Sequence, residues 1–199
     1  MKEMAKTQWN SYGKVKYLIT DASEEISSDG ISRLVFKDKS CVDKSDCYVL
    51  LNEIPTIHTG PVGITKVYFT YWKGYWYIAN HLSLLKNLHS NFPLSKQALY
   101  HYFFFHCIPA PHSIYEGLFK TSAGSEIHLS DDGVWDSEVS YNPKFNDRQQ
   151  ESIATLQNQG LHIIDECVKE ATKENSGAFL SGGLDSSTVA GMMAKHQTS

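Results

Sequence analysis

The sequence predicts an α+β fold that passes into the start of an α/β fold, and three observations support this prediction. Up to about residue 140, short segments rich in β-branched and aromatic residues alternate with polar, Gly or Pro stretches, which is typical of antiparallel β-structure. From about residue 146, apolar residues recur at helical spacing. A Ser/Gly-rich turn at residues 181–187 then separates a short apolar run from a second helical stretch.

The first part of the chain contains five predicted strands and two predicted hairpins. The strands cover residues 15–20, 31–37, 47–52, 65–71 and 75–79. Residues 72–74 form a tight turn between the last two strands, because Gly74 can adopt a positive φ. A second hairpin joins residues 126–129 to residues 134–139 through a turn at 131–133.

Helices are predicted on both sides of a domain boundary. Ser95 can cap a helix over residues 96–106, which must end before Pro109. After the boundary, Asn146 can cap a long helix over residues 147–174, with Gln149 in the capping-box position. Its predicted apolar face comprises Ile153, Leu156, Leu161, Ile164, Val168 and Ala171. A buried strand at 178–180 and a helix over 187–195 complete the prediction.

Composition limits the function classes. The chain has 199 residues, of which 41% are hydrophobic and 20% charged, and its formal net charge is −4. This composition fits a globular protein and provides no basic field for nucleic acid. The start lacks the apolar core of a secretory signal, and no run is long enough to span a membrane. We therefore expect a cytoplasmic protein with no nucleic-acid or membrane partner.

Four cysteines fit that compartment. They form no CxxC pair, so buried thiols in a reducing cytosol are expected rather than a zinc site. The cysteines are Cys41, Cys47, Cys107 and Cys167.

The segment from Ser181 to Ser187, which reads SGGLDSS, carries the chemistry. Its two glycines permit a sharp turn and a close approach to a ligand. The first turn of the following helix offers free N–H groups and the positive end of the helix dipole to an anion. Asp185 would repel a bare phosphate, so its presence implies Mg²⁺. The segment has neither the lysine of a Walker loop nor the GxGxxG spacing.

This segment resembles the pyrophosphate-binding PP-loop of ATP pyrophosphatases. The preceding Ala178-Phe179-Leu180 resembles the version found in the asparagine synthase (glutamine-hydrolysing) family, as do residues 98–117 with their Ile108-Pro109-Ala110-Pro111 core. Residues 121–124 and, more loosely, 141–143 follow the same family pattern. The resemblance covers about residues 97–195 and is weak before residue 65.

The resemblance implies two domains. Residues 1–145 would be a degenerate class II glutamine amidotransferase-like domain with an antiparallel, Ntn-hydrolase-like fold. Residues 146–199 would be the truncated start of a synthetase domain with an adenine nucleotide α-hydrolase-like (PP-loop) fold.

The resemblance also implies the chemistry of an amide-forming ligase. A carboxylate substrate, aspartate in a true asparagine synthase, attacks the α-phosphorus of ATP, pyrophosphate leaves, and an amine attacks the resulting acyl-adenylate. Asp185 would hold Mg²⁺ through the pyrophosphate, and catalysis would rest on positioning and on stabilisation of the leaving charge. The ATP and pyrophosphate site would comprise Leu180, Ser181, Gly182, Gly183, Leu184, Asp185, Ser186 and Ser187.

The sequence departs from the family in two places. Glutamine-dependent members have a nucleophilic cysteine directly after the initiator Met, whereas this sequence has Lys2, so no catalytic residue is expected there. Few residues follow Ser187, so we expect a chain that lacks most of the synthetase domain and is inactive alone. The apolar face of the predicted helix 147–174 would then be uncovered and could drive self-association.

Three functions stay open from the sequence. The first is an asparagine synthase-like ligase. The second is a relative that never used glutamine, such as a β-lactam synthetase or a lasso-peptide cyclase, which Lys2 favours. The third is a non-catalytic interaction module or pseudoenzyme fragment, which the length of the chain favours.

Overall fold

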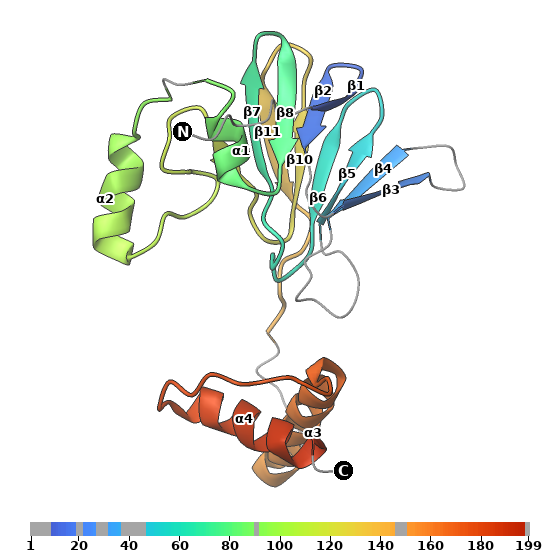
Figure 1. Cartoon of the computed structure of the whole chain (residues 1–199), viewed down its shortest axis with the longest axis vertical. Helices are drawn as coiled ribbons and strands as arrows, with labels where there is room; N and C mark the ends of the chain where they lie inside the picture. Colours follow the sequence, from blue (N-terminus) through green and yellow to red (C-terminus); the bar gives the residue numbers. More distant parts are fainter. Residues whose placement is uncertain are drawn as a thin grey trace. The chain divides into compact units, whose positions relative to one another are not determined.

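A computed structural model describes residues 9–18, 22–26, 32–36, 47–89, 92–145 and 151–197. The chain divides into two compact units, Met1–Pro143 and Lys144–Ser199, and each is described by itself. This division falls close to the predicted boundary between residues 145 and 146. The first unit consists mainly of strands and the second of two helices, as Figure 1 shows.

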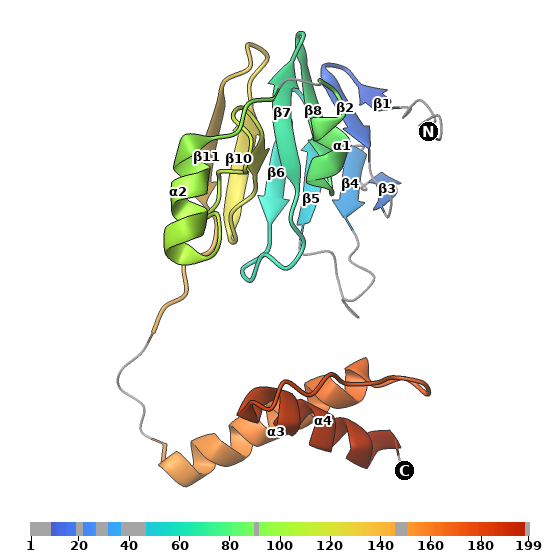
Figure 2. The same ribbon diagram turned by 60° about the vertical axis from the view of Figure 1, so that its left-hand side comes forward.

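Two β-sheets form the body of the first unit (Figure 2). Every strand pair is antiparallel except the parallel pair β2–β8. The first sheet has the order β1 (Asn10–Tyr12), β2 (Val15–Leu18), β8 (Tyr75–Ala79), β7 (Tyr68–Trp72) and β9 (Phe119–Lys120). The second has the order β11 (Trp135–Val139), β10 (Ser125–Leu129), β6 (Thr56–Thr59), β5 (Cys47–Leu51), β4 (Ser32–Phe36) and β3 (Ala22–Ile26).

All five predicted strands are present, as β2, β4, β5, β7 and β8, and both predicted hairpins are confirmed. In the turn between β7 and β8, Lys73 and Gly74 have φ values of 49° and 81°, the pattern of a two-residue hairpin whose twist matches its strands. Four strands were not predicted. They are β1, β3, β6 and β9, which are short or polar and gain their hydrogen bonds from neighbouring strands.

The core of this unit lies between the two sheets. Strands β5 and β10 alternate buried and half-buried residues, so every second side chain points inward. Phe69 is fully buried, and its ring lies 5.4 Å from that of Trp135 and 6.2 Å from that of Trp76, between centroids. The buried set is Val15, Cys47, Val49, Leu51, Ile57, Val67, Phe69, Trp76, Ile78, Ile127 and Leu129.

A second cluster covers the other face of the first sheet. The short helix α1 (Leu82–Lys86) places the buried Leu85 against Tyr77 and Ala79 of β8. The unit is therefore mixed α/β with antiparallel sheets, which is compatible with the predicted β-rich domain.

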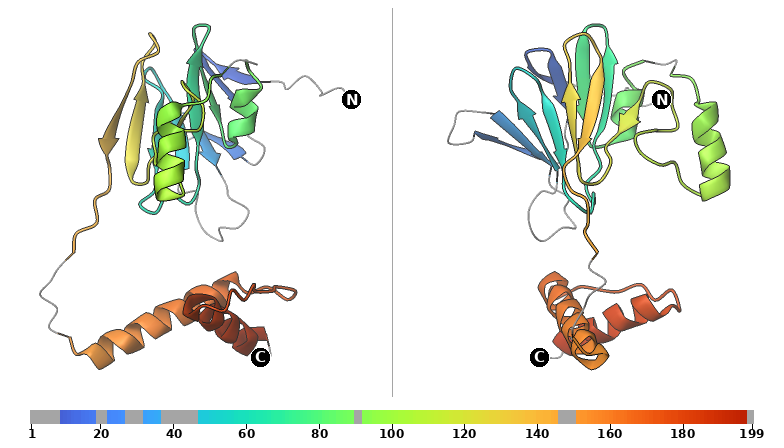
Figure 3. Two further views of the ribbon diagram at one scale, coloured as in Figure 1. Left: turned by 90° about the vertical axis from the view of Figure 1, so that its left-hand side faces the viewer. Right: turned by 180° about the vertical axis from the view of Figure 1, so that it is seen from behind.

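Helix α2 (Lys96–Phe105) belongs to an arm that leaves this body and returns to it (Figure 3). The predicted cap is confirmed, because the Ser95 Oγ accepts a hydrogen bond from the Ala98 N–H at 3.2 Å. The helix ends at His106, which adopts the left-handed conformation with a φ of 57°.

The second unit contains α3 (Ile153–Ala171) and α4 (Leu184–Gln197). The predicted long helix is confirmed, but it begins later than expected. Ser152 is its cap, with its Oγ accepting from the Thr155 N–H at 3.1 Å. The predicted cap Asn146 and the capping-box Gln149 lie outside the described residues. At the other end, the Thr172 hydroxyl donates to the Val168 carbonyl at 2.7 Å, and the helix stops at Ala171 rather than near residue 174.

Two predictions for the second unit are wrong. Residues 178–180 form no strand, and Phe179 is 99% exposed. An extended segment becomes a strand only when a neighbour pairs with its N–H and C=O groups, and no described strand does so here. Helix α4 begins at Leu184, not Ser187, so the end of the SGGLDSS segment is already helical.

The expectation of mostly buried thiols is also corrected. Cys47 is buried, whereas Cys107 and Cys167 are exposed, and Cys41 lies outside the described residues. Across the described part of the chain, we find no helix with the length and apolar character needed to cross a membrane.

Candidate functional site

The loop at residues 181–187 leads directly into α4. Gly182 has a φ of 82°, a conformation that favours glycine, so the predicted sharp turn is present. Because α4 begins at Leu184, the N–H groups of Leu184, Asp185 and Ser186 have no acceptor within the helix. The loop thus presents backbone donors at the positive end of a helix dipole, which suits an anion.

The three loop serines gather around Gly183. The hydroxyls of Ser186 and Ser187 donate to the Gly183 carbonyl at 3.1 and 2.9 Å. The Ser181 and Ser186 hydroxyl oxygens lie 2.9 Å apart. The structure therefore brings together all three predicted hydroxyl donors, which hold the loop in a closed shape through internal hydrogen bonds. These hydroxyls would have to rotate to donate to a bound ligand.

Asp185 lies in the first turn of α4 and is exposed. Among the described residues, no group forms a hydrogen bond or an ion pair with its carboxylate. An open carboxylate beside a cluster of anion donors suits Mg²⁺ that is held mainly by phosphate oxygens, because such ions need only one or two protein carboxylates. Within the described part of the chain, no cluster of three or more His, Cys, Asp or Glu forms a ready metal site, so a cation here would depend on the phosphates.

The two leucines of the predicted site flank the loop. Leu180 is 68% exposed and Leu184 is 82% exposed. Leu180 therefore does not lie in the buried strand that the sequence predicted. Both side chains are apolar and exposed to solvent. Any contact of Leu180 and Leu184 with ATP or pyrophosphate would come from their backbone groups and stays a prediction.

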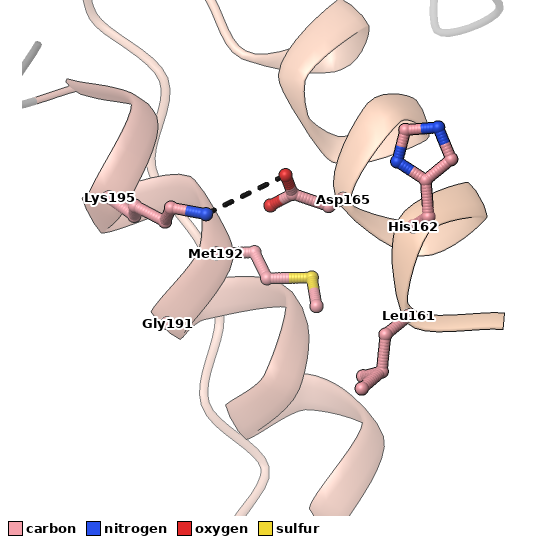
Figure 4. A pocket seen from close by; sticks show the side chains of 6 residues that line it. All are labelled: Leu161, His162, Asp165, Gly191, Met192 and Lys195. Atoms are coloured by element: carbon pink, nitrogen blue, oxygen red, sulfur yellow. Dashed lines mark ion pairs between the residues drawn. The ribbon is translucent and has the colours of Figure 1, made fainter. Parts of the chain in front are cut away.

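A charged cluster between α3 and α4 was not predicted from the sequence. The Asp165 carboxylate lies 2.9 Å from the His196 Nε2 and 3.7 Å from the Lys195 Nζ, as Figure 4 shows for the lysine. The hydrogen bond from His196, with the positive charge of Lys195, lowers the pKa of Asp165 below its ordinary value. The partners are 30 and 31 positions apart in the sequence, so no local pattern indicates the contact.

This charged cluster borders a shallow hollow between the two helices. Figure 4 shows Asp165, Met192 and Lys195 around it, and its remaining lining residues are Leu161, His162 and Gly191. The cluster and the hydrogen bond from the Gln197 Nε2 to the Ser176 carbonyl, at 2.7 Å, hold the C-terminal end of α4 against the α3 side of the unit. These contacts hold α4 in place, and the loop at residues 181–187 leads into the first turn of this helix.

The same helix pair carries an open apolar groove of about 290 Å³. Of the predicted apolar face, Ile153 is 81%, Leu161 52% and Ile164 41% exposed, whereas Val168 is buried. The predicted face is therefore uncovered in part, and self-association through it stays a prediction. The groove is lined by Ile163, Ile164, Cys167, Val168, Ala171, Val189 and Met193.

Comparison with known proteins agrees with these features. Residues 161–199, which include the loop and α4, match the asparagine synthase family. The chain is 30% identical over 141 residues to a putative asparagine synthetase [glutamine-hydrolyzing] 2 of Methanocaldococcus jannaschii, with 64% of this chain and 26% of that protein covered. It is 27% identical over 130 residues to asparagine synthetase [glutamine-hydrolyzing] 1 of Bacillus subtilis, with 65% and 21% covered.

The family match falls on the helix pair that carries the Ser/Gly loop. The chain is similar to members of the asparagine synthase family. It spans about a quarter of the length of the curated relatives that it matches.

Proposed function

We propose that this chain carries the ATP and pyrophosphate loop of an amide-forming ligase related to asparagine synthetases. The observation that carries the proposal is the SGGLDSS segment at the start of α4, inside the residues that match the family. Free N–H groups, three hydroxyls and an open carboxylate meet within seven residues. These groups suit a polyphosphate that carries a cation. A turn that merely starts a helix would not require all of them.

Each group in the loop has a role in this proposal. The N–H groups of Leu184, Asp185 and Ser186 would donate to phosphate oxygens, together with the hydroxyls of Ser181 and Ser187. Asp185 would hold Mg²⁺ against the phosphates, and the ion would neutralise charge on the departing pyrophosphate. Gly182 would allow the phosphates to approach the backbone closely, because it has no side chain and its φ of 82° is strained for other residues.

The reaction is proposed from the relatives. The two matched proteins carry the name asparagine synthetase with glutamine hydrolysis. For this chain we propose carboxylate activation by ATP, with aspartate as the first substrate to test. The proposal is limited to this activation step and does not extend to glutamine hydrolysis.

The first unit would serve as a degenerate glutamine amidotransferase-like domain. Its two mainly antiparallel sheets, with a helix on one outer face, support the proposal of an Ntn-hydrolase-like origin. The second unit would be the start of the PP-loop domain, and the cytoplasm would be the compartment.

Binding of magnesium pyrophosphate to the full chain tests the proposal. We expect a calorimetric titration to show Mg²⁺-dependent binding that Asp185→Asn weakens by about tenfold or more, since loss of one charge-assisted contact costs roughly 1.5–3 kcal/mol. Glu174→Gln, which removes an exposed carboxylate from the same unit, should bind as the wild type does. Binding that is absent, or equal in both variants, would contradict the proposal.

A further inference from the structure

The outer face of the second sheet carries a row of titratable side chains across neighbouring strands. In the strand register, His58 of β6 stands opposite Tyr48 of β5 on one side and opposite Glu126 of β10 on the other. Glu126 in turn stands opposite Glu138 of the edge strand β11. The residues on either side of Glu126 in β10 are buried in the core, so this row lies on the face away from the core. Side chains that face one another in this way are close enough to interact.

His58 makes two contacts whose strength depends on its charge. Its Nδ1 lies 3.2 Å from the Glu126 Oε1. Its ring stacks on that of Tyr48, with centroids 4.6 Å apart and planes at 16°. A carboxylate and the face of an aromatic ring both attract a cation, so a protonated imidazole strengthens both contacts. The side chain of His58 is 18% exposed, so solvent and salt screen the pair only in part.

Glu138 makes the attachment of β11 sensitive to the charge of His58. Like charges that stand directly opposite each other destabilise a strand pair. A protonated His58 offsets the charge of Glu126, whereas a neutral His58 leaves two carboxylates facing each other across β10 and β11. Carboxylates stay ionised near neutral pH, whereas an imidazole changes its charge there. The pairing of β10 with β11 should therefore weaken as the pH rises.

A second row on the same face acts in the same direction. His128 of β10 stands opposite Asp136 of β11 in the register. On its other side, the His128 Nδ1 lies 3.2 Å from the Thr56 Oγ1 of β6. Arg33 belongs to β4, two strands away from β6 in the sheet. Protonation of His128 would add positive charge beside Asp136, so it would also favour the attachment of β11.

Strand β11 is the element on which these charges act. It is an edge strand, and β10 is the one strand that pairs with it in the described part of the chain. At its start, the ring of Trp135 lies 5.4 Å from that of Phe69, between centroids. Beyond its end, the Gly124 carbonyl accepts hydrogen bonds from the N–H groups of Ser140 and Tyr141 at 2.8 and 3.1 Å. The outer-face charges therefore bear on residues 136–139, between these two anchors and just before the unit ends at Pro143.

We propose that His58 is a pH switch that strengthens the attachment of the edge strand β11 when the pH falls from about 8 to about 6. The effect reaches β11 through Glu126, which faces both His58 and Glu138. The proposal does not depend on the pyrophosphate loop, because it concerns the other unit of the chain.

Hydrogen exchange of the full chain, measured at about pH 6 and about pH 8, tests the proposal. Protection factors compare each measured rate with the intrinsic rate at the same pH, so they report the opening of the strand. We expect residues 136–139 to be about two- to fivefold more protected at the lower pH, the range for one cross-strand pair. Residues 68–72 of β7, which belong to the other sheet, should change less.

Four variants separate the switch from a general effect of pH. His58→Gln should remove most of the difference, and Glu138→Gln should remove it by raising the protection at the higher pH. Two controls should behave as the wild type. They are Glu53→Gln, at an exposed carboxylate, and His81→Gln, at an exposed helix cap whose side chain forms no capping hydrogen bond. Tryptophan fluorescence that matches the wild type would show that each variant is folded.

Two results would overturn the proposal. One is a wild type whose protection at residues 136–139 is the same at both pH values. The other is a pH difference that His58→Gln leaves intact. A chain that fails to bind pyrophosphate would alter neither result, so the two proposals can fail separately.

Discussion

Asp165 shows how one side chain can organise the second unit. Its carboxylate bonds to two residues in the last turn of α4, and its side chain is about one quarter exposed. The position of α4, and therefore of the loop at its start, depends in part on this contact. At the scale of residues, the SGGLDSS loop could be predicted from the sequence because all its groups are contiguous. The contacts of Asp165 could not be predicted from the sequence, because its partners lie on another helix.

The pH dependence of stability tests the role of Asp165. Because its folded pKa is lowered, the carboxylate stabilises the unit above its ordinary pKa of 3.8, and this contribution disappears as the pH falls through the lower folded value. We expect Asp165→Asn to lower the thermal stability of the second unit at pH 7, and the difference from the wild type to shrink as the pH falls below 3.8.

Far-UV circular dichroism at 222 nm follows this transition, since the second unit consists of helices. All four tryptophans lie in the first unit, at Trp9, Trp72, Trp76 and Trp135, so their fluorescence reports on that unit separately. Glu174→Gln is the matched control. A stability difference between Asp165→Asn and the wild type that stays constant from pH 7 to pH 2.5 would argue against the ion contact.

At the scale of elements, the strands that could be predicted from the sequence are those stabilised by their own apolar residues. Strands β5 and β8 were predicted because their own apolar residues form the core. Strand β3 reads ASEEI and is held by the register it shares with β4, which the sequence alone does not indicate. The predicted strand at 178–180 is absent because no described neighbouring strand pairs with it, although the segment is apolar.

Two glycines in the second unit should respond to alanine with opposite signs. Gly160 lies inside α3, and an added Cβ would meet nothing within 4 Å. Gly160→Ala should therefore stabilise the unit by about 0.5–1 kcal/mol, because alanine favours the helix. Gly182→Ala should destabilise the loop by about 1–2 kcal/mol, because its φ of 82° is unfavourable for alanine.

Urea unfolding followed at 222 nm measures both changes. Gly177→Ala provides a control outside the helices, since Gly177 has open space around it and no positive φ. Destabilisation by Gly160→Ala would show that the middle of α3 is not a regular helix in solution.

At the scale of the whole molecule, two units of different character share one chain. The first has a buried core between two sheets, and its α2 helix exposes aromatic side chains. The second has one buried residue on α3 and none on α4, so most of its apolar surface faces solvent. The chain covers about a quarter of its relatives.

Binding of pyrophosphate by the loop at the start of α4 can be measured directly. The most direct measurement is a titration of the ¹⁵N-labelled full chain with magnesium pyrophosphate, followed by NMR of the backbone amides. We expect saturable shifts at Leu184, Asp185 and Ser186, little change at Gly160 in the same unit, and loss of the shifts in Asp185→Asn. Shifts that are absent from the loop, or spread evenly over exposed lysines elsewhere in the chain, would contradict this binding.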